Sequence, residues 1–234
     1  MSKIFVDQVD PKTGTSLTLG TSGDTVNIPS GVTLANGGTV TGLPASAISS
    51  GTIATARLGS GTASSSTFLR GDQTYAAVGG ITAASQWRLT TNFSGVSSAN
   101  PIASNWELSD TTGYGSLGSN MTESSGIFTF PSTGYWHIWA VINFYINGQS
   151  LYNSCAIMAT VNNSSYANAT DCYTSINTSG TGYASASGDF IFDVTNTSTH
   201  KVRLDTAIQN NGTTVQGSSI DLRTGMTFIR LGDT

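Results

Sequence analysis

Side chains that could carry out acid–base or metal chemistry are few in this 234-residue chain. The only glutamates are Glu107 and Glu123, and the only histidines are His137 and His200. Glycosidic-bond hydrolysis needs two carboxyl groups that flank the scissile bond. Such a pair would have to come from the aspartates, and their spacing selects no pair: Asp189, Asp193, Asp205 and Asp221. We therefore predict no catalytic residues and no enzyme, with a glycan-cleaving enzyme as the less favoured alternative.

His137 lies inside a long apolar segment, and two roles are open to its imidazole. A histidine in such a segment is more often hydrogen-bonded at a packed interface than bound to a metal. The alternative is a cluster of His137 side chains around a threefold axis, which would be a metal site. We adopt the interface interpretation, so we predict no metal site and no cofactor.

Cys155 and Cys172 are the only two cysteines. One pair in a chain of this size is not a disulfide framework. Their sequence neighbours suggest adjacent strands, so a disulfide is possible, while two buried free thiols is the simpler interpretation. The sequence leaves this choice open.

The composition favours a β-rich protein with few charges. Charged residues make up 9% of the chain, well below the globular average of about 25%. Gly, Ser, Thr and Asn dominate instead, which argues against helices. A net charge of −4 with 38% apolar residues also differs from the composition of disordered chains. The fold class predicted from these features is all-β.

Charge and hydropathy also limit the partners. The scattered Lys and Arg form no basic stripe, so we predict no nucleic-acid partner. No apolar run approaches the roughly 20 residues that a membrane span needs, so no membrane insertion is predicted. The first residues lack the regions of a signal peptide. We therefore expect synthesis in a cytoplasm.

The element that must position His137 is residues 126–146, the most informative segment of the chain. A short strand meets Pro131, turns, and opens a long strand that is apolar on both faces, and each face needs cover. One face can fill a sandwich core: Trp136, Ile138, Ala140, Ile142 and Phe144. The other face contains Tyr135, His137, Trp139, Val141 and Tyr145. Since a symmetry-related copy would cover it, we predict an obligate oligomer whose interface is Tyr135, His137, Trp139 and Val141.

Composition divides the chain into three parts. Residues 1–44 carry apolar pairs two positions apart, such as Leu17 with Leu19. This spacing predicts short strands of a β-rich shaft that neighbouring coils or chains must cover. Residues 45–80 have few large apolar residues and form a neck or linker. We favour an ordered neck over a flexible linker because single large apolar residues recur at wide spacing: Ile48, Ile53, Leu58, Phe68 and Leu69.

Residues 81–234 contain nearly all the aromatic side chains and form the predicted head domain. Turn-rich clusters separate short strand-like segments, which predicts a jelly roll or sandwich. The expected strands are residues 86–93, 105–108, 127–130, 135–146, 154–161, 184–193, 201–209, 219–222 and 226–231.

Binding is the remaining function, and loops on a rigid sandwich suit it. Residues 162–183 are rich in Tyr, Asn, Ser and Gly, the types that adaptable binding surfaces favour. Tyrosine rings can stack on sugars while Asn and Ser bond to hydroxyl groups. The predicted receptor-binding residues are Tyr166, Asn168, Tyr173, Asn177 and Tyr183. Polar turns without a ligand are the alternative for each of them.

Residues 126–138 resemble the signature of the complement C-one-q and tumour necrosis factor head family. Trp136 and Ile138 stand where that family has Tyr and Phe, and residues 224–231 look like its final core strand. The resemblance implies a ten-stranded jelly roll that packs as a compact homotrimer. The family's calcium-binding residues do not map clearly onto this chain. Four positions match the family pattern: Gly126, Phe128, Pro131 and Gly134.

The front of the chain resembles the N-terminal and shaft regions of tail fibre proteins from phages of marine bacteria, especially cyanophages. The likeness is carried by residues 1–9, 17–26, 51–58 and 67–75. It implies a virion fibre in which Ile4, Phe5 and Val6 attach to another virion protein, of the tail or the capsid.

Together these observations predict a homotrimeric fibre with a β-rich shaft and a jelly-roll head that binds a bacterial surface glycan or protein. The predicted location is the virion, after synthesis in the host cytoplasm. A capsid or neck decoration fibre without receptor binding is the alternative.

Overall fold

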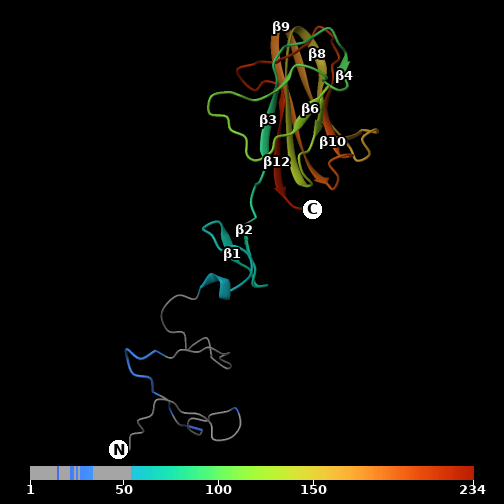
Figure 1. The fold of residues 1–234 in the computed structure, drawn as a ribbon. Helices are drawn as coiled ribbons and strands as arrows, with labels where there is room; N and C mark the ends of the chain where they lie inside the picture. Colours follow the sequence, from blue (N-terminus) through green and yellow to red (C-terminus); the bar gives the residue numbers. More distant parts are fainter. Residues whose placement is uncertain (1–14, 16–21, 24, 26, 34–53, 78) are drawn as a thin grey trace, which may run out of the picture. The chain divides into compact units, whose positions relative to one another are not determined.

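The computed structural model describes residues 15, 22–23, 25, 27–33, 54–77 and 79–234 (Figure 1). The chain divides into two compact units, Met1–Gly59 and Ser60–Thr234. The predicted attachment residues Ile4, Phe5 and Val6 lie outside the described residues, as does most of the predicted shaft. The domain boundaries predicted at residues 44 and 80 remain predictions. In the described part of the first unit, one 3-10 turn, η2, spans Thr55–Arg57.

The second unit begins with a hairpin of two short strands, β1 (Thr67–Leu69) and β2 (Tyr75–Ala77). Its turn is closed by the Arg70 N–H, which donates to the Thr74 carbonyl at 2.8 Å, and the Thr74 hydroxyl donates to Asp72 at 2.6 Å. A two-stranded hairpin is marginally stable by itself. This part of the predicted neck is therefore built of strands, but it leaves Phe68 and Leu69 exposed.

The rest of the second unit is a ten-stranded jelly-roll sandwich, which confirms the all-β prediction. No helix in the described part of the chain is long and apolar enough to cross a membrane. The strands are β3 (Ala84–Leu89), β4 (Ser98–Ala99), β5 (Trp106–Leu108), β6 (Thr122–Ser124), β7 (Ile127–Thr129), β8 (Gly134–Thr160), β9 (Ala167–Val194), β10 (Lys201–Ala207), β11 (Thr214–Val215) and β12 (Gly225–Gly232).

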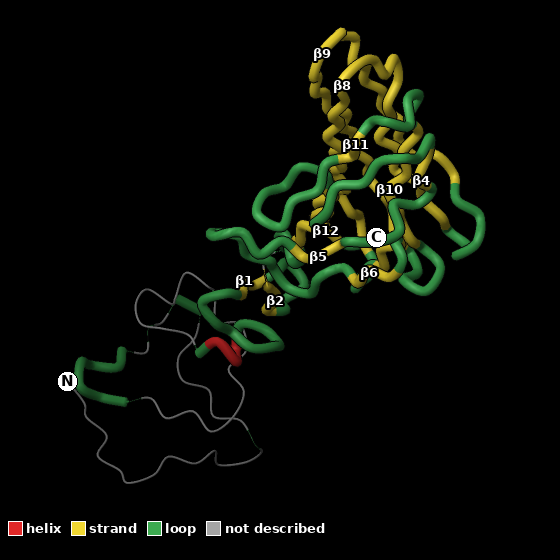
Figure 2. The backbone as a smooth tube through the Cα atoms, turned by 90° about the horizontal axis from the view of Figure 1, so that it is seen from above, coloured by secondary structure: helices red, strands yellow, loops and turns green. Residues whose placement is uncertain are grey.

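Strands β8 and β9 run antiparallel along almost their whole length and belong to both layers of the sandwich (Figures 1 and 2). The first half of β8 pairs with β12 and with the second half of β9. Its second half pairs with β10 and with the first half of β9. Register shifts between Asn147 and Asn153 mark the place where β8 changes layer. One layer is therefore β5–β3–β12–β8–β9, and the other is β6–β7–β10–β8–β9.

Two glycines show that the halves of β9 face each other across the sandwich. A Cβ atom on Gly188 would lie 2.5 Å from Thr170 Cγ2, and one on Gly182 would lie 2.5 Å from Ile176 Cγ2. The Thr170 hydroxyl also donates to the Asp189 carbonyl at 2.7 Å. Glycine is therefore needed at these two positions, where the halves of β9 approach each other closely.

The core between the layers is aromatic. The Phe128 ring on β7 lies 5.2 Å from the ring of Phe228 on β12 and 5.7 Å from that of Trp87 on β3. Burial of each such side chain stabilises the fold by about 1.5–3 kcal/mol. The predicted core face of β8 is confirmed, since all five side chains are at most 1% exposed: Trp136, Ile138, Ala140, Ile142 and Phe144.

Most expected strands are confirmed, with two wrong assignments. The expected strands 135–146 and 154–161 are the two halves of β8, and 184–193 is the second half of β9. Residues 162–183 were expected to form binding loops, but most of them belong to β9, whose first half is a strand of small and polar residues. Side chains in such a strand still point alternately to the two faces of the sheet. Because few of them are large and apolar, the sequence shows no apolar alternation from which the strand could be predicted.

The expected strand at residues 219–222 is a loop. The Ser218 hydroxyl accepts hydrogen bonds from the backbone N–H groups of Ile220 and Asp221, both at 3.2 Å. Side-chain bonds of this kind compete with strand pairing.

Candidate functional site

The outward side of β8 carries an aromatic and apolar surface that continues onto both neighbouring strands. His137 lies directly across from Ile191 on β9 and from Ile229 on β12. Tyr145 lies across from Tyr183, with ring centroids 5.0 Å apart. Directly opposed residues share one face of a sheet. We call this surface the outer aromatic face and define it by Tyr135, His137, Trp139, Val141, Tyr145, Tyr183, Ile191 and Ile229.

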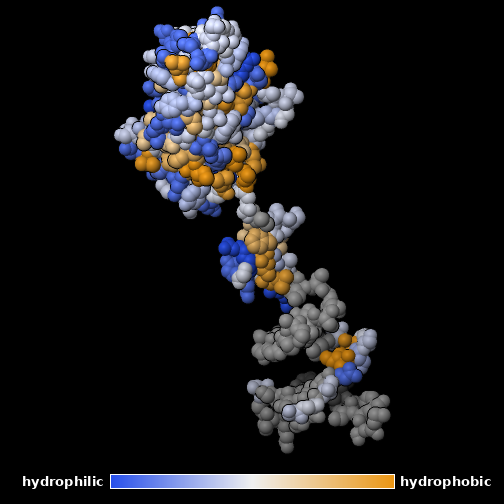
Figure 3. Space-filling view, turned by 180° about the vertical axis from the view of Figure 1, so that it is seen from behind, coloured by the Kyte–Doolittle hydropathy of each residue, from blue (hydrophilic) through white to orange (hydrophobic). Residues whose placement is uncertain are grey.

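Large side chains on this face remain open to solvent. Tyr135 is 43% exposed, Ile191 58% and Tyr183 67%. Leu231, next to Gly232 opposite Tyr135, adds another exposed side chain at the same end of β8. Figure 3 shows hydrophobic side chains gathered at one end of the head and along the β1–β2 hairpin. Contiguous exposed apolar surface usually marks an interaction site.

A polar pair lies within the outer aromatic face. His137 Nε2 is 3.2 Å from Asp189 Oδ2, so the two form an ion pair whenever the imidazole is protonated. No three metal-binding side chains lie together in the described part of one chain. The absence of a metal site remains a prediction, because the alternative, a His137 cluster, would be built from several copies. The trimer interface assigned to Tyr135, His137, Trp139 and Val141 also remains a prediction.

The five predicted receptor-binding residues do not form one site. Tyr183 belongs to the outer aromatic face, and Asn177 bonds to Gln149 where β8 and β9 change layer. The Tyr166 ring lies beneath the Arg203 guanidinium, 4.4 Å from ring centroid to Cζ.

Only Asn168 and Tyr173 are brought together. The Tyr173 hydroxyl donates to Asp171 Oδ2 at 2.7 Å, and Asn168 Nδ2 donates to the same oxygen at 3.2 Å. The sequence prediction did not include Asp171, since an isolated aspartate gives no signal by itself.

Three of the four aspartates considered for catalysis, all but Asp193, lie beside a basic side chain. Asp205 is buried beside Arg203, which pairs with its Oδ2 atom. The other carboxylate oxygen, Oδ1, is buried without a hydrogen-bond partner among the described residues. Burial raises the pKa of Asp205, and Arg203 opposes that rise. Glu123 accepts the Gly126 N–H at 2.6 Å, and Asp221 pairs with Arg223 at 3.3 Å. The absence of enzymatic activity remains a prediction.

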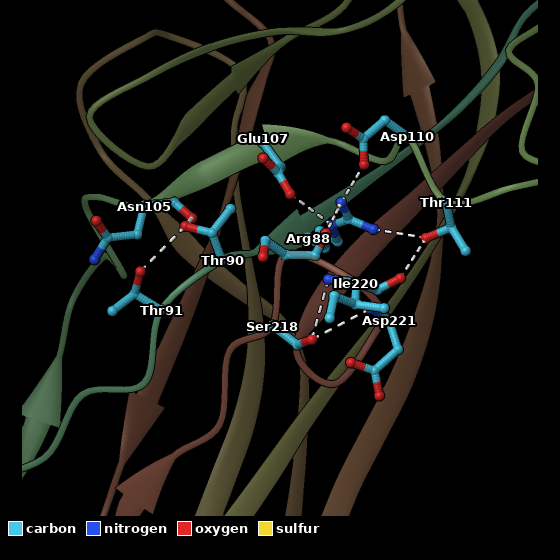
Figure 4. A network of polar contacts seen from close by, with 11 residues as sticks. Arg88, Thr90, Thr91, Asn105, Glu107, Asp110, Thr111, Ser218, Ile220 and Asp221 are labelled. Carbon is cyan, nitrogen blue, oxygen red and sulfur yellow. Dashed lines mark hydrogen bonds and ion pairs between the residues drawn. The ribbon is translucent and has the colours of Figure 1, made fainter.

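A buried arginine fixes the loop that precedes β12 (Figure 4). Arg88 on β3 is only 1% exposed. Its Nε donates to Glu107 Oε1 at 2.7 Å and its Nη1 to the Thr111 hydroxyl at 2.6 Å. Its Nη2 reaches Asp110 and the Ser219 carbonyl. Arg88 therefore joins three segments that are far apart in the sequence.

Loop residue Ile220 is held by the same network. The Thr111 hydroxyl donates to the Ile220 carbonyl at 2.8 Å, which extends the Arg88 network into the loop (Figure 4). The Ile220 side chain is 77% exposed. The network was not predicted, because a single arginine in a sequence normally indicates a solvated surface position.

The two cysteines face each other in register, Cys155 on β8 and Cys172 on β9. Both are free thiols, and Cys155 is buried. Burial, followed by the neighbouring Cys172 and Asp171, raises the pKa of Cys155 to about 12. The Cys155 thiol is therefore protonated and unreactive at neutral pH.

No protein-family model matches the chain, and no curated protein matches it. Among solved structures, it is similar to murine APRIL at pH 8.5, with 11% identity, a TM-score of 0.46, and coverage of 64% of this chain and 98% of that one. It is also similar to Eiger TNF from S. frugiperda, with 14% identity, a TM-score of 0.46, and coverage of 64% of this chain and 93% of that one. Similarities this weak do not assign a family, an assembly or a partner to this chain.

Proposed function

We propose that this chain forms a homotrimer through the outer aromatic face, and that the trimer is the attachment head of a virion fibre that binds a bacterial surface. The observation that carries the proposal is the row of exposed aromatic and apolar side chains on a rigid sheet, including Tyr135, Tyr183 and Ile191. A second copy of the chain is the partner that every expressed copy encounters.

Threefold symmetry requires two different surfaces, because each copy presents one surface to one neighbour and another to the next. The outer aromatic face supplies the first. The edge of β9 supplies the second, since β9 pairs only with β8 among the described strands. Unpaired strand edges need cover, and a neighbouring subunit provides it.

The β1–β2 hairpin supports the same assembly. Phe68 is 46% exposed and Leu69 41% exposed on a hairpin too small to be stable alone. Three hairpins brought together would bury these side chains. Trimerisation would therefore bury exposed apolar side chains in two separate parts of the chain, the neck and the head.

The role in a virion rests on the fibre-like front of the chain and on its low charge. Attachment to another virion protein is assigned to Ile4, Phe5 and Val6. Adhesion is the proposed mechanism, because three identical sites on one head give avidity even when each site is weak.

A charge placed in the outer aromatic face tests the assembly. Ile191→Asp in the full chain should give monomers by analytical ultracentrifugation, because the new carboxylate would be buried at the interface. Ile220→Asp is the matched control, since Ile220 is also exposed but lies on the loop before β12. Equal masses for the two variants would overturn the interface.

Cell binding tests the attachment role. The fluorescently labelled full chain should decorate susceptible bacteria at micromolar concentration and block infection. A trimer that does neither would contradict receptor binding and would leave a decoration fibre.

A further inference from the structure

The end of the head at which β8 and β9 change layer contains an open hollow of about 600 Å³. It lies at the opposite end of the first half of β8 from Tyr135. None of its lining residues is charged, and four of the six carry amide side chains: Ser97, Gln149, Leu151, Gln209, Asn210 and Asn211.

Three of the four amide side chains are fixed by hydrogen bonds. Asn210 Nδ2 donates to the Gln149 carbonyl at 2.8 Å, and its Oδ1 accepts the Gly212 N–H at 3.0 Å. Gln209 Oε1 accepts the Leu151 N–H, and Gln149 Nε2 donates to Asn177. These bonds hold the amide groups of Gln149, Gln209 and Asn210 in place before any ligand arrives.

Other polar groups of the hollow have no hydrogen-bond partner in the described part of the chain. Among the described residues, no hydrogen bond reaches Gln209 Nε2, Gln149 Oε1 or the side chain of Asn211. The hollow therefore presents both donors and acceptors that only solvent or a ligand can satisfy. Groups held in their binding positions lose little entropy when a ligand binds.

The backbone beneath the hollow is also fixed. Ser150 and Asn153 are fully buried, and the Ser150 hydroxyl donates to Asn153 Oδ1 at 2.7 Å. The Gln209 N–H donates to the Tyr152 carbonyl at 3.0 Å. Leu151, which is 52% exposed, adds an apolar contact to the lining.

We infer that this hollow binds an uncharged saccharide. Each sugar hydroxyl both donates and accepts, as does each amide group, and the apolar face of a sugar ring can pack on Leu151. An anionic ligand is disfavoured, because no Lys or Arg lines the hollow. The inference rests on the proposed attachment function and assigns it a site and a ligand class.

Two variants test the site directly. In the full chain, Asn211→Ala and Gln209→Ala each remove a free polar group from the hollow. Asn196→Ala is the matched control, because Asn196 is an exposed amide between β9 and β10, outside the hollow. The probe is an array of uncharged oligosaccharides built from glucose, galactose, mannose and N-acetylglucosamine. Thermal melting and mass of each variant verify folding, and if Gln209→Ala does not fold, Asn211→Ala alone decides.

We expect the wild-type chain to bind at least one oligosaccharide, Asn211→Ala to weaken that binding about tenfold or more, and Asn196→Ala to leave it unchanged. No binding to the array, or equal binding by wild type and Asn211→Ala, overturns the inference.

Labelling of bacterial cells separates the two proposals. If Asn211→Ala labels cells as well as wild type does, the saccharide site is wrong but attachment stands. If the wild-type chain labels no cells, the attachment function itself fails.

Discussion

Replacing Arg88 with methionine should destabilise the head and release the loop before β12. The methionine keeps most of the apolar volume of the arginine stem but removes the guanidinium, which is 1% exposed and bonds to four groups. Glu107 and Asp110 have side chains that are 34% and 77% exposed, so water can solvate these carboxylates in the variant.

The loss therefore comes mainly from the Thr111 hydroxyl and the Ser219 carbonyl. Bonds from a charged donor contribute about 1.5–3 kcal/mol each, so two such bonds contribute about 3–6 kcal/mol. The variant no longer has to bury a charged group, which offsets part of this loss. We expect the free energy of unfolding to fall by about 3 kcal/mol, a large share of the roughly 5–15 kcal/mol of a typical domain.

Urea unfolding followed by tryptophan fluorescence measures this difference, at one protein concentration because assembly affects stability. Arg223→Met is the matched control, since the Arg223 side chain is 41% exposed and pairs with the exposed Asp221. Removal of such a surface pair should change stability by at most about 1 kcal/mol. Trypsin should also cut faster after Arg223 in the Arg88→Met variant than in wild type. Equal stability of the two variants, or unchanged cleavage, would refute the role assigned to Arg88.

Three further predictions concern the core and the buried charges. Phe128→Ala should cost about 3–5 kcal/mol in urea unfolding, because the Phe128 ring is fully buried between the layers, and a loss below about 1 kcal/mol would contradict this packing. Gly188→Val should lower the melting temperature, since even its Cβ would lie 2.5 Å from Thr170 Cγ2, and an unchanged melting temperature would mean that the halves of β9 are not in contact. Arg203→Met should cost more stability near pH 7 than near pH 4. Burial raises the folded-state pKa of Asp205, so the unpaired carboxyl is harmless while protonated and destabilises as the pH rises through that pKa. A loss independent of pH in calorimetry would contradict this.

The fold could be predicted from the sequence where the apolar side chains of a single segment alternate with a period of two residues. Residues 136–144 alternate apolar side chains at every second position, and this alternation predicted the core face of β8 correctly. The closing segment was also predicted correctly, since β12 pairs with β8 and buries Met226 and Phe228. A local two-residue period is sufficient evidence for such elements.

The surfaces could not be predicted in the same way, because they depend on the register between distant segments. Ile191 and Ile229 join the outer aromatic face only because both lie opposite His137. The hollow likewise combines Gln149 with Gln209, which are brought together when β8 changes layer. The predicted binding residues were selected by type alone, and the structure places them in separate regions.

The mass of the full chain in solution tests the central claim most directly. Sedimentation equilibrium at micromolar concentration should give three times the 24.2 kDa of one chain. A mass of 24.2 kDa under these conditions would contradict the trimer and leave the outer aromatic face without its proposed partner.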